Sequence, residues 1–481
     1  MTVPTETAPM ASASPLDRRK FFGSATAMSL SAAGYSNVVG ANERIGLAFI
    51  GCGGRAQAHI DLIRRFIQNG QPLAIRAVCD VWDGLEDEYD VAFGGKVTRR
   101  RYSQGLFPSA VKCGLDPADR ARVSKDFRRT LDLADVDAVC IATPDHWHGR
   151  MTLDAFAAGK DAFIEPPFTR TAEEAHLAVE AWRTSGRVAT VGTQSLADPV
   201  WMKAFEAIRG GKIGPVAMGQ TGSFRNDLRG QWRYYRLARE MNPKTVDWDL
   251  FLGHAFEVGG RPLGPKPKAQ PFDRAVFAQW RCCTPFSSGP LSDLLTPNLT
   301  RMIAAMGVRE PSSVLCEGSL NVERDGRTVP DTVNLIANFG DGGALMAAAS
   351  TTSSYPMEET IRGRLGTIKF VKGGFHTFRD DPSRGATFPP RLERPLEPTE
   401  FTGVEPPKNE TEAMWENFLS CVRSRKHATY CPPDLAALAT TVVARGEAQL
   451  ASRIRETRPA PTSLVNPPGY QKLAGPHREG A

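Results

Sequence analysis

The sequence contains no pair of cysteines in C-x-x-C spacing, although its 481 residues include nine cysteines. Such pairs are typical of zinc sites and redox-active dithiols. Cys52, Cys79 and Cys140 instead fall within or at the ends of apolar runs, where cysteine is usually a small buried hydrophobe. We therefore expect neither a disulfide framework nor a zinc site. The adjacent Cys282 and Cys283 are expected to point to opposite faces of a strand.

The sequence also lacks a basic stripe interleaved with stacking aromatic residues, which is typical of nucleic-acid-binding proteins. Its net charge of +6 is modest for this length, and part of it lies in clusters such as 98–102 and 209–212. We interpret these clusters as solvated surface and expect no nucleic-acid partner. A hydrophobic content of 41% and a charged content of 23% describe an ordinary globular chain, long enough for two or three domains.

The first 41 residues have the pattern of an export signal. Arg18 and Arg19 precede Phe21 and Phe22 and a weakly apolar stretch of Ala, Ser, Met and Leu, which is typical of the bacterial twin-arginine route. The stretch is too short and too rich in Ser and Gly to span a bilayer stably. We therefore expect a periplasmic or secreted protein without stable membrane insertion.

A glycine-rich turn follows the first apolar run, Ile45 to Ile50. The segment from Gly51 through Cys52, Gly53, Gly54 and Arg55 to Ala56 has the pattern G-x-G-x-x-A, and a helical pattern follows it. Gly51 allows the tight turn, Gly53 allows the backbone to approach a pyrophosphate, and Ala56 allows close packing of helix on strand. Because strand, turn and helix occur in the required order, the segment predicts a dinucleotide-binding site.

The next strand ends at Asp80, where an acidic side chain can accept hydrogen bonds from the adenosine ribose hydroxyls. No arginine follows at once to receive a 2′-phosphate. The pattern therefore favours NAD and leaves NADP open, while an ordinary surface aspartate remains the alternative. Residues 91–123 form an insertion without a clear period, to which we assign no structure.

The segment after the insertion resumes the alternation of helix and strand, with strands expected over 138–143 and 161–165. His146 and His148 lie on the turn between them. Two histidines without a nearby acidic or cysteine cluster more often line a pocket or cap a helix than bind metal, so we expect no metal site.

Four segments resemble the Gfo/Idh/MocA family of NAD(P)-dependent oxidoreductases: the glycine-rich turn from Gly51 to Ala56, "ATPDHWH", "AGKDAFIEPP" and "VGTQ". Further blocks, including "VDWDLFLG", "SSGPLSDLLTPNLTRM" and "NETEAMWENFLSCVRS", resemble its exported bacterial branch. The resemblance implies a Rossmann domain over 42–192 and an α/β domain over 193–455 with a large, open, mostly antiparallel sheet, followed by an irregular tail over 456–481. It also implies a homo-oligomer formed through that sheet. Five strand-like runs in the second half fit this architecture, separated from the last helix by a linker over 373–407.

The same resemblance implies the site residues. The cofactor contacts are expected from the glycine-rich turn, from the turn that contains His148 and from residues that follow other strands. These residues are Gly51, Gly53, Gly54, Arg55, Ala56, Asp80, Thr143, Pro144, His148, Glu165 and Gln194. The substrate is expected to be a sugar or sugar-derived alcohol, whose hydride passes to the nicotinamide while a base takes the hydroxyl proton.

Two of the family's three proton-handling positions are occupied by proline. The family's lysine in Glu-Lys-Pro corresponds to Pro166, and its histidine four positions after an aspartate corresponds to Pro297. The aspartate is retained as Asp293. Pro297 either interrupts a helix, at a cost of about 3 kcal/mol, or marks its start and leaves Asp293 on a loop.

We take Asp293 and His148 as the candidate catalytic residues. The other polar candidates are Glu165, Asp145, Asn298, Tyr234 and Tyr235. Three hypotheses remain open: an active oxidoreductase, a non-catalytic cofactor-binding relative that serves in binding or assembly, and an NAD-dependent glycosidase or lyase. The two prolines favour the second hypothesis and count against the third.

Overall fold

The computed structural model describes residues 44–93, 96–253, 257–258, 261–262, 268–340, 342–380 and 397–456. The predicted export signal and the tail after residue 456 lie outside these ranges. The chain forms two compact units, each built from three stretches. The first unit contains residues up to 200 together with 232–287 and 404–440, and the second contains 201–231, 288–403 and the residues from 441.

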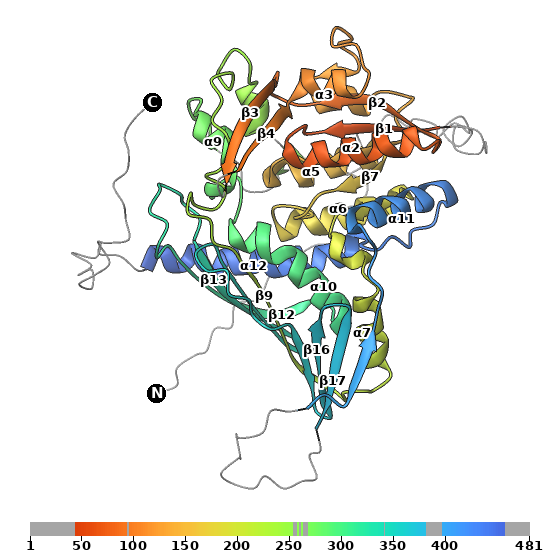
Figure 1. The fold of residues 1–481 in the computed structure, drawn as a ribbon, viewed down its shortest axis with the longest axis vertical. Helices are drawn as coiled ribbons and strands as arrows, with labels where there is room; N and C mark the ends of the chain where they lie inside the picture. Colours follow the sequence, from red (N-terminus) through yellow and green to blue (C-terminus); the bar gives the residue numbers. More distant parts are fainter. Residues whose placement is uncertain are drawn as a thin grey trace, which may run out of the picture. The chain divides into compact units, whose positions relative to one another are not determined.

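The first unit is built on a six-stranded parallel sheet in the order β5-β2-β1-β6-β7-β8 (Figure 1). Its central strands are apolar on both faces and fully buried, as expected for a sheet covered by helices on both sides. The strands are all parallel, but the order in which they follow along the chain reverses between β1 and β6, and in such sheets ligands bind beyond the carboxyl ends of the strands at this point. The strands are β1 (Ile45–Ile50), β2 (Leu73–Cys79), β5 (Val123–Ser124), β6 (Ala138–Ile141), β7 (Asp161–Ile164) and β8 (Ala189–Val191).

The helices of this unit start where the sequence offers caps or small residues. Thr171 and Glu174, for example, form a capping box at the start of α6. The helices are α2 (Gly54–Gln68), α3 (Leu106–Lys112), α4 (Phe127–Leu131), α5 (Asp145–Ala157), α6 (Ala172–Ser185), α8 (Trp248–Leu252), α9 (Arg274–Ala278) and α11 (Glu410–Ser424), with short 3₁₀ turns η1 (Gln194–Ala197) and η2 (Trp280–Cys282) and a small ladder of β10 (Glu257–Val258) with β11 (Arg261–Pro262).

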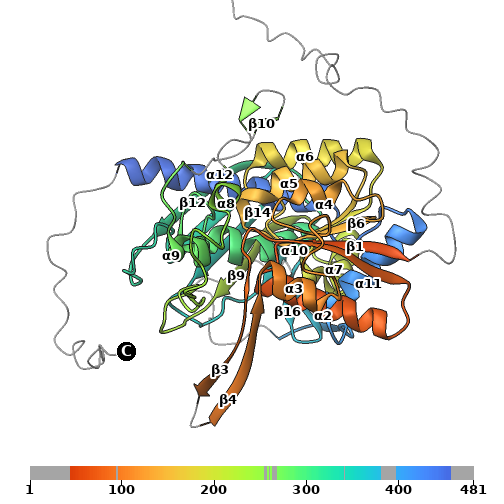
Figure 2. The same ribbon diagram turned by 90° about the horizontal axis from the view of Figure 1, so that it is seen from above.

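The insertion over 91–123, to which the sequence assigned no structure, contains regular elements. β3 (Leu85–Phe93) and β4 (Lys96–Gln104) pair as an antiparallel hairpin, and α3 follows directly. Figure 2 shows the hairpin extending away from the Rossmann sheet. Its base packs against Trp82, Ala238, Met241 and Val246 through Leu85 and Tyr102. The hairpin is therefore anchored at the end of β2.

The second unit contains an eight-stranded mixed sheet in the order β12-β13-β14-β9-β15-β16-β17-β18. Apart from the β14–β9 pair, neighbouring strands are antiparallel. The predicted fold class, a Rossmann domain with an α/β domain built on a mostly antiparallel sheet, is confirmed. The strands are β9 (Val216–Phe224), β12 (Pro311–Ser319), β13 (Thr332–Phe339), β14 (Gly343–Ser350), β15 (Thr360–Gly363), β16 (Gly366–Val371), β17 (Gly374–Arg379) and β18 (Glu400–Gly403).

Helix α10 (Thr296–Met306) lies across one face of this sheet (Figure 1). Gly219 of β9 makes room for it, because a Cβ at that position would lie 2.6 Å from the sulfur of Met306. The π-helical turn η3 (Pro290–Leu295) precedes α10, and α7 (Val200–Arg209) and α12 (Pro433–Glu456) complete the described helices.

Three local expectations were wrong or incomplete. Cys282 and Cys283 do not lie on a strand, because Cys282 ends the 3₁₀ turn η2. The expected linker over 373–407 contains β17 and β18, which pair with each other and extend the sheet. Pro297 is the second residue of α10, but η3 runs directly into α10 and Leu295 has helical backbone angles, so Pro297 lies at a junction within one helical stretch and Asp293 lies in its π-helical part rather than on a loop.

Candidate cofactor site

The glycine turn after β1 has the geometry that its sequence requires. Gly51 adopts φ +84°, and a Cβ there would lie 2.7 Å from the carbonyl oxygen of Ala142 at the end of β6. Only glycine fits this close approach of the two strand ends. Around Gly53 the situation is the opposite, because no atom lies within 4 Å of the position that its Cβ would occupy. The turn therefore leaves open space where the pyrophosphate of a dinucleotide would be held.

Helix α2 begins at this turn, and no side chain among the described residues accepts hydrogen bonds at its N-cap. Gly53 is its N-cap, no side chain caps it, and its first turn contains no acidic residue. Its first backbone N–H groups and the positive end of its dipole are thus available to an anion. Ala56 is fully buried, so the helix packs closely on the strand. These features fit a bound dinucleotide.

Asp80, which follows β2, contacts the turn directly. Its Oδ2 accepts the backbone N–H of Cys52 at 2.6 Å, and its Oδ1 accepts that of Trp82 at 2.9 Å. Burial raises the pKa of Asp80 to about 6, although these two hydrogen bonds and the charge of Lys125 oppose the shift. Each carboxylate oxygen keeps a further lone pair for a ribose hydroxyl.

The surroundings of Asp80 favour NAD over NADP. Lys125 is the cation that acts on Asp80, and its Nζ is held by Asp83 at 2.8 Å and by the carbonyl oxygen of Thr245 at 2.9 Å. A 2′-phosphate would face Asp80 and Asp83 and would have to compete for this lysine.

Glu165, the residue before the double proline, accepts hydrogen bonds from three side chains. Arg55 Nε donates to Oε2 at 2.8 Å, while His59 Nε2 and Gln194 Nε2 lie 2.8 and 3.2 Å from Oε1. Burial raises the pKa of Glu165, but its hydrogen bonds to His59 and Arg55 and the charge of Arg55 outweigh burial and lower this pKa to about 2. Glu165 therefore joins the end of β7 to α2 and to η1.

His59 also connects Glu165 to α11. The indole Nε1–H of Trp415 donates to His59 Nδ1 at 2.8 Å, and both side chains are fully buried. Because Nδ1 accepts this bond, the proton of a neutral ring lies on Nε2, which then donates to Glu165. Arg55 Nη2 is buried and has no hydrogen-bond partner among the described residues, so it remains able to donate to a ligand beside the turn.

His148 contacts the backbone of the double proline, Pro166-Pro167. Its Nδ1 lies 2.6 Å from the carbonyl oxygen of Pro167 and its Nε2 lies 2.9 Å from that of Thr143, and the side chain is 1% exposed. Each ring nitrogen faces a carbonyl oxygen to which a ring N–H can donate, so His148 contacts the backbone of both strand-end turns. This arrangement favours a role in holding the turn over proton transfer.

His146 occupies an aromatic environment formed by Trp147, Phe251 and Phe286. Burial lowers its pKa to about 3, although a hydrogen bond between Nε2 and the carbonyl oxygen of Phe251, at 2.7 Å, opposes the shift. His146 is therefore neutral at physiological pH. Within the described ranges, no three His, Cys, Asp or Glu side chains gather as metal ligands would.

Asp293 lies in the second unit, half-buried in η3. Its backbone N–H donates to the carbonyl oxygen of Gly289, and Gly289 adopts φ +60° with Val329 packed against it. Asn298 donates through its side chain to the carbonyl oxygen of Gly222 and so ties α10 to β9. Tyr234 and Tyr235 contact each other in the first unit, with ring centroids 4.9 Å apart.

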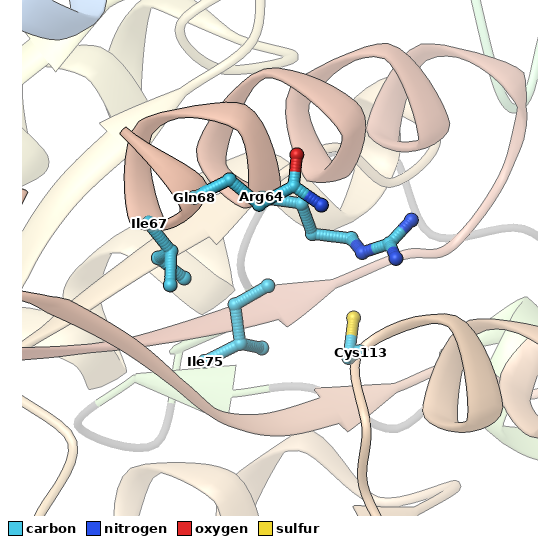
Figure 3. A pocket seen from close by; sticks show the side chains of 5 residues that line it. All are labelled: Arg64, Ile67, Gln68, Ile75 and Cys113. Carbon is cyan, nitrogen blue, oxygen red and sulfur yellow. The ribbon is translucent and has the colours of Figure 1, made fainter. Parts of the chain in front are cut away.

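The structure brings together the predicted cofactor residues of the first unit at the carboxyl ends of β1, β2, β6, β7 and β8. The sequence missed His59 and Trp415. Their partners are far apart along the chain, although His59 lies four residues after Arg55 and thus on the same face of α2. A surface pocket between α2, β2 and Cys113 (Figure 3) contains none of the predicted residues. It lies near the other end of α2, roughly 15 Å from the glycine turn by helical rise.

Comparison with known proteins agrees with an NAD-binding fold in the first unit. Residues 44–193 match the family described as "Oxidoreductase family, NAD-binding Rossmann fold". An alpha-N-acetylgalactosaminidase of Shewanella oneidensis is 26% identical over 229 residues, which cover 46% of this chain and 43% of that protein. The chain thus spans less than half the length of this curated relative.

Solved structures of similar fold cover both units. A levoglucosan dehydrogenase in complex with NADH and levoglucosan gives a TM-score of 0.56 at 17% identity, covering 85% of this chain and 98% of that one. An aldose-aldose oxidoreductase from Caulobacter crescentus gives 0.53 at 19% identity, with the same coverage. At these identities the likeness establishes the fold.

Proposed function

We propose, from the premise that residues 44–193 form an NAD-binding Rossmann domain of the Gfo/Idh/MocA oxidoreductase family, that this protein acts on a sugar or a sugar-derived alcohol by hydride transfer. The open space at Gly53, at the uncapped start of α2, is the observation that carries the cofactor assignment. The sugar-like substrate is supported by levoglucosan and aldose enzymes among the proteins of similar fold.

Bound NAD would supply the hydride acceptor. The chain's own residues would bind and orient it: the turn and Arg55 at the pyrophosphate, Asp80 at the adenosine ribose, and Glu165 with Gln194 at the strand ends nearer the nicotinamide. In this proposal Glu165 positions its neighbours, because three donors already occupy its oxygens.

Proton transfer is proposed to fall to Asp293. Pro166 and Pro297 have no titratable side chain, and both ring nitrogens of His148 face backbone carbonyl oxygens. A single carboxylate can accept the hydroxyl proton during oxidation and return it during reduction. If Asp293 does not accept the hydroxyl proton, the protein is the non-catalytic relative, which binds the cofactor without turnover.

An NAD-dependent glycosidase is the second candidate, favoured by the Shewanella oneidensis alpha-N-acetylgalactosaminidase among the relatives. Such an enzyme oxidises a sugar carbon transiently and then eliminates the aglycone. It needs the same hydride acceptor and also a base, so Asp293 would be required in either case.

The deciding experiment is to purify the full chain and measure NADH and NADPH affinity. Reduction of added NAD is then followed with a panel of free sugars, polyols and nitrophenyl glycosides. We expect NADH binding in the micromolar range and NADPH binding at least tenfold weaker. Turnover of a sugar or polyol that Asp293→Asn abolishes supports the oxidoreductase, and NAD-dependent nitrophenol release supports the glycosidase. Binding without any turnover supports the non-catalytic relative, and absence of nucleotide binding excludes all three.

We further propose export by the twin-arginine route, based on Arg18 and Arg19. Fusion of residues 1–41 to a folded reporter tests this, since replacing both arginines by lysine should retain the reporter in the cytoplasm. Within the described residues, no helix has the length and apolar character needed to cross a membrane.

A homo-oligomer through the second unit's sheet is also proposed. Leu315 of β12 and Ile336 of β13 are paired in register, and they are 53% and 41% exposed. Adjacent exposed apolar residues on one sheet face are typical of an interface.

A further inference from the structure

The β3–β4 hairpin reaches the glycine turn through its last residue. A Cβ built on Gly54, the first residue of α2, would lie 3.2 Å from Nε2 and 4.0 Å from Cδ of Gln104, and no other residue comes within 4 Å. At neighbouring Gly53 the same position is open. The Gln104 amide nitrogen therefore borders the open space that the turn provides.

The neck of the hairpin, formed by Gly84 and Gly105, is held against the glycine turn. Gly84 and Gly105 adopt φ +104° and +88°, and a Cβ on Gly105 would lie 2.2 Å from the Cα of Gly84. Only two glycines allow the strands to meet this closely. The N–H of Gly105 then donates to the carbonyl oxygen of Cys52, inside the turn, at 3.0 Å.

Tyr102 orients the Gln104 amide. Its hydroxyl donates to Gln104 Oε1 at 3.1 Å, which leaves the NH₂ group facing α2. The Tyr102 ring is held in turn by the Arg236 guanidinium, 5.5 Å from the ring centroid, and by the apolar cluster at the hairpin base. Burial raises the pKa of Tyr102 to about 12, so the hydroxyl stays protonated and able to donate at neutral pH.

We infer that Gln104, supplied by the hairpin inserted after β2, is a cofactor-binding residue that donates its side-chain N–H to the dinucleotide's pyrophosphate, with Tyr102 as its positioning residue. This inference rests on the proposed function. It assigns the insertion a role, because the hairpin adds a side-chain donor from outside the Rossmann core to the backbone donors of the turn and α2. The hairpin neck thus forms one wall of the phosphate site.

The test compares the affinity of the full-length protein and of three variants for NADH, ADP-ribose and adenosine. Gln104→Ala should weaken NADH and ADP-ribose binding roughly tenfold, as expected for loss of a hydrogen bond to a charged group. Gln104→Glu should weaken both further, because a carboxylate would face the phosphates. Adenosine, which has no phosphate, should bind all variants as it binds the wild type. Ser103→Ala, on the opposite face of the same strand, is the matched control and should bind all three ligands normally.

A double-mutant cycle separates positioning from general stability. Tyr102→Phe keeps the ring packing and should weaken NADH binding by a smaller factor, whereas Tyr102→Phe combined with Gln104→Ala should equal Gln104→Ala alone. Thermal unfolding of each ligand-free variant is measured in parallel. Wild-type affinity for NADH in both Gln104 variants would overturn this inference and leave the proposed function standing. Absence of NADH binding by the wild type would overturn both.

Discussion

Asp80 is the residue whose protonation we expect to affect both stability and cofactor binding. Burial raises its pKa to about 6, so between about pH 4, near the unfolded value, and pH 6 the folded protein holds a proton that the unfolded chain has released. Its contribution to the free energy of unfolding therefore falls as pH rises through this window. NADH affinity should show the opposite trend, rising with pH up to about 6, because the ionised carboxylate is the better acceptor for ribose hydroxyls.

Asp80→Asn should remove both dependences and weaken NADH binding at least tenfold at pH 7.5. Urea unfolding and NADH titration between pH 4.5 and 7.5 measure the two effects. Exposed Asp132→Asn is the control. A variant that keeps the wild-type pH profile would show that another group is responsible.

Glu165 should behave in the opposite way. Its hydrogen bonds to His59 and Arg55 and the charge of Arg55 outweigh burial and lower its pKa to about 2, so its stabilising contribution is complete above the unfolded value of about 4.3. It is lost as pH falls from about 4 toward 2. Glu165→Gln should cost about 3 kcal/mol of unfolding free energy at pH 7, because Arg55 and His59 lose an ionised acceptor. Denaturant unfolding measures this, and exposed Glu180→Gln should stay within about 0.5 kcal/mol. A similar loss in both variants would contradict the assignment.

The position of Pro297 in α10 determines its effect on the free energy of unfolding. A proline in the first turn of a helix lacks only an N–H that has no intrahelical acceptor. Pro297 is the second residue of α10, and the π-helical turn η3 directly before it already departs from the i→i−4 pattern, so we expect Pro297→Ala to change the free energy of unfolding by less than about 1 kcal/mol. Thr300→Pro, inside the same helix, should cost about 3 kcal/mol. Equal losses in denaturant unfolding would place Pro297 in the helix interior.

The hairpin shows how an element without a strong sequence signal gains its structure. An isolated hairpin is marginal in water. β3 and β4 gain support at their base from Ala238, Met241 and Val246 and from the ion pair of Arg236 with Asp87. Both contacts join distant parts of the chain, which explains why local pattern left the insertion unassigned.

Assembly of the whole molecule is predicted to depend on the exposed face of the eight-stranded sheet. Leu315→Glu combined with Ile336→Lys should convert the oligomer to a monomer, because it places charges on an apolar contact. Light scattering coupled to gel filtration measures the mass. Leu228→Glu is the matched control, since Leu228 is fully exposed in the same unit but lies on a loop. A wild-type monomer would contradict the predicted interface.

Local patterns in the sequence predicted the β1–turn–α2 segment, the acidic end of β2 and most strands of the second unit. These features depend on local chemistry: glycine where the backbone must turn or be approached, and period-two or continuous apolar runs where strands are buried. Segments with mixed patterns, such as 91–123 and 373–407, were assigned wrongly or not at all.

The contacts between distant side chains could be seen only after the chain had folded. Trp415 lies 356 residues from His59, and Gln104 reaches Gly54 across the whole of β2 and the hairpin. The structure also showed which neighbours contact Glu165 and His148. Such contacts follow from how whole elements pack, because one hydrogen bond between distant side chains leaves no period or spacing in the sequence.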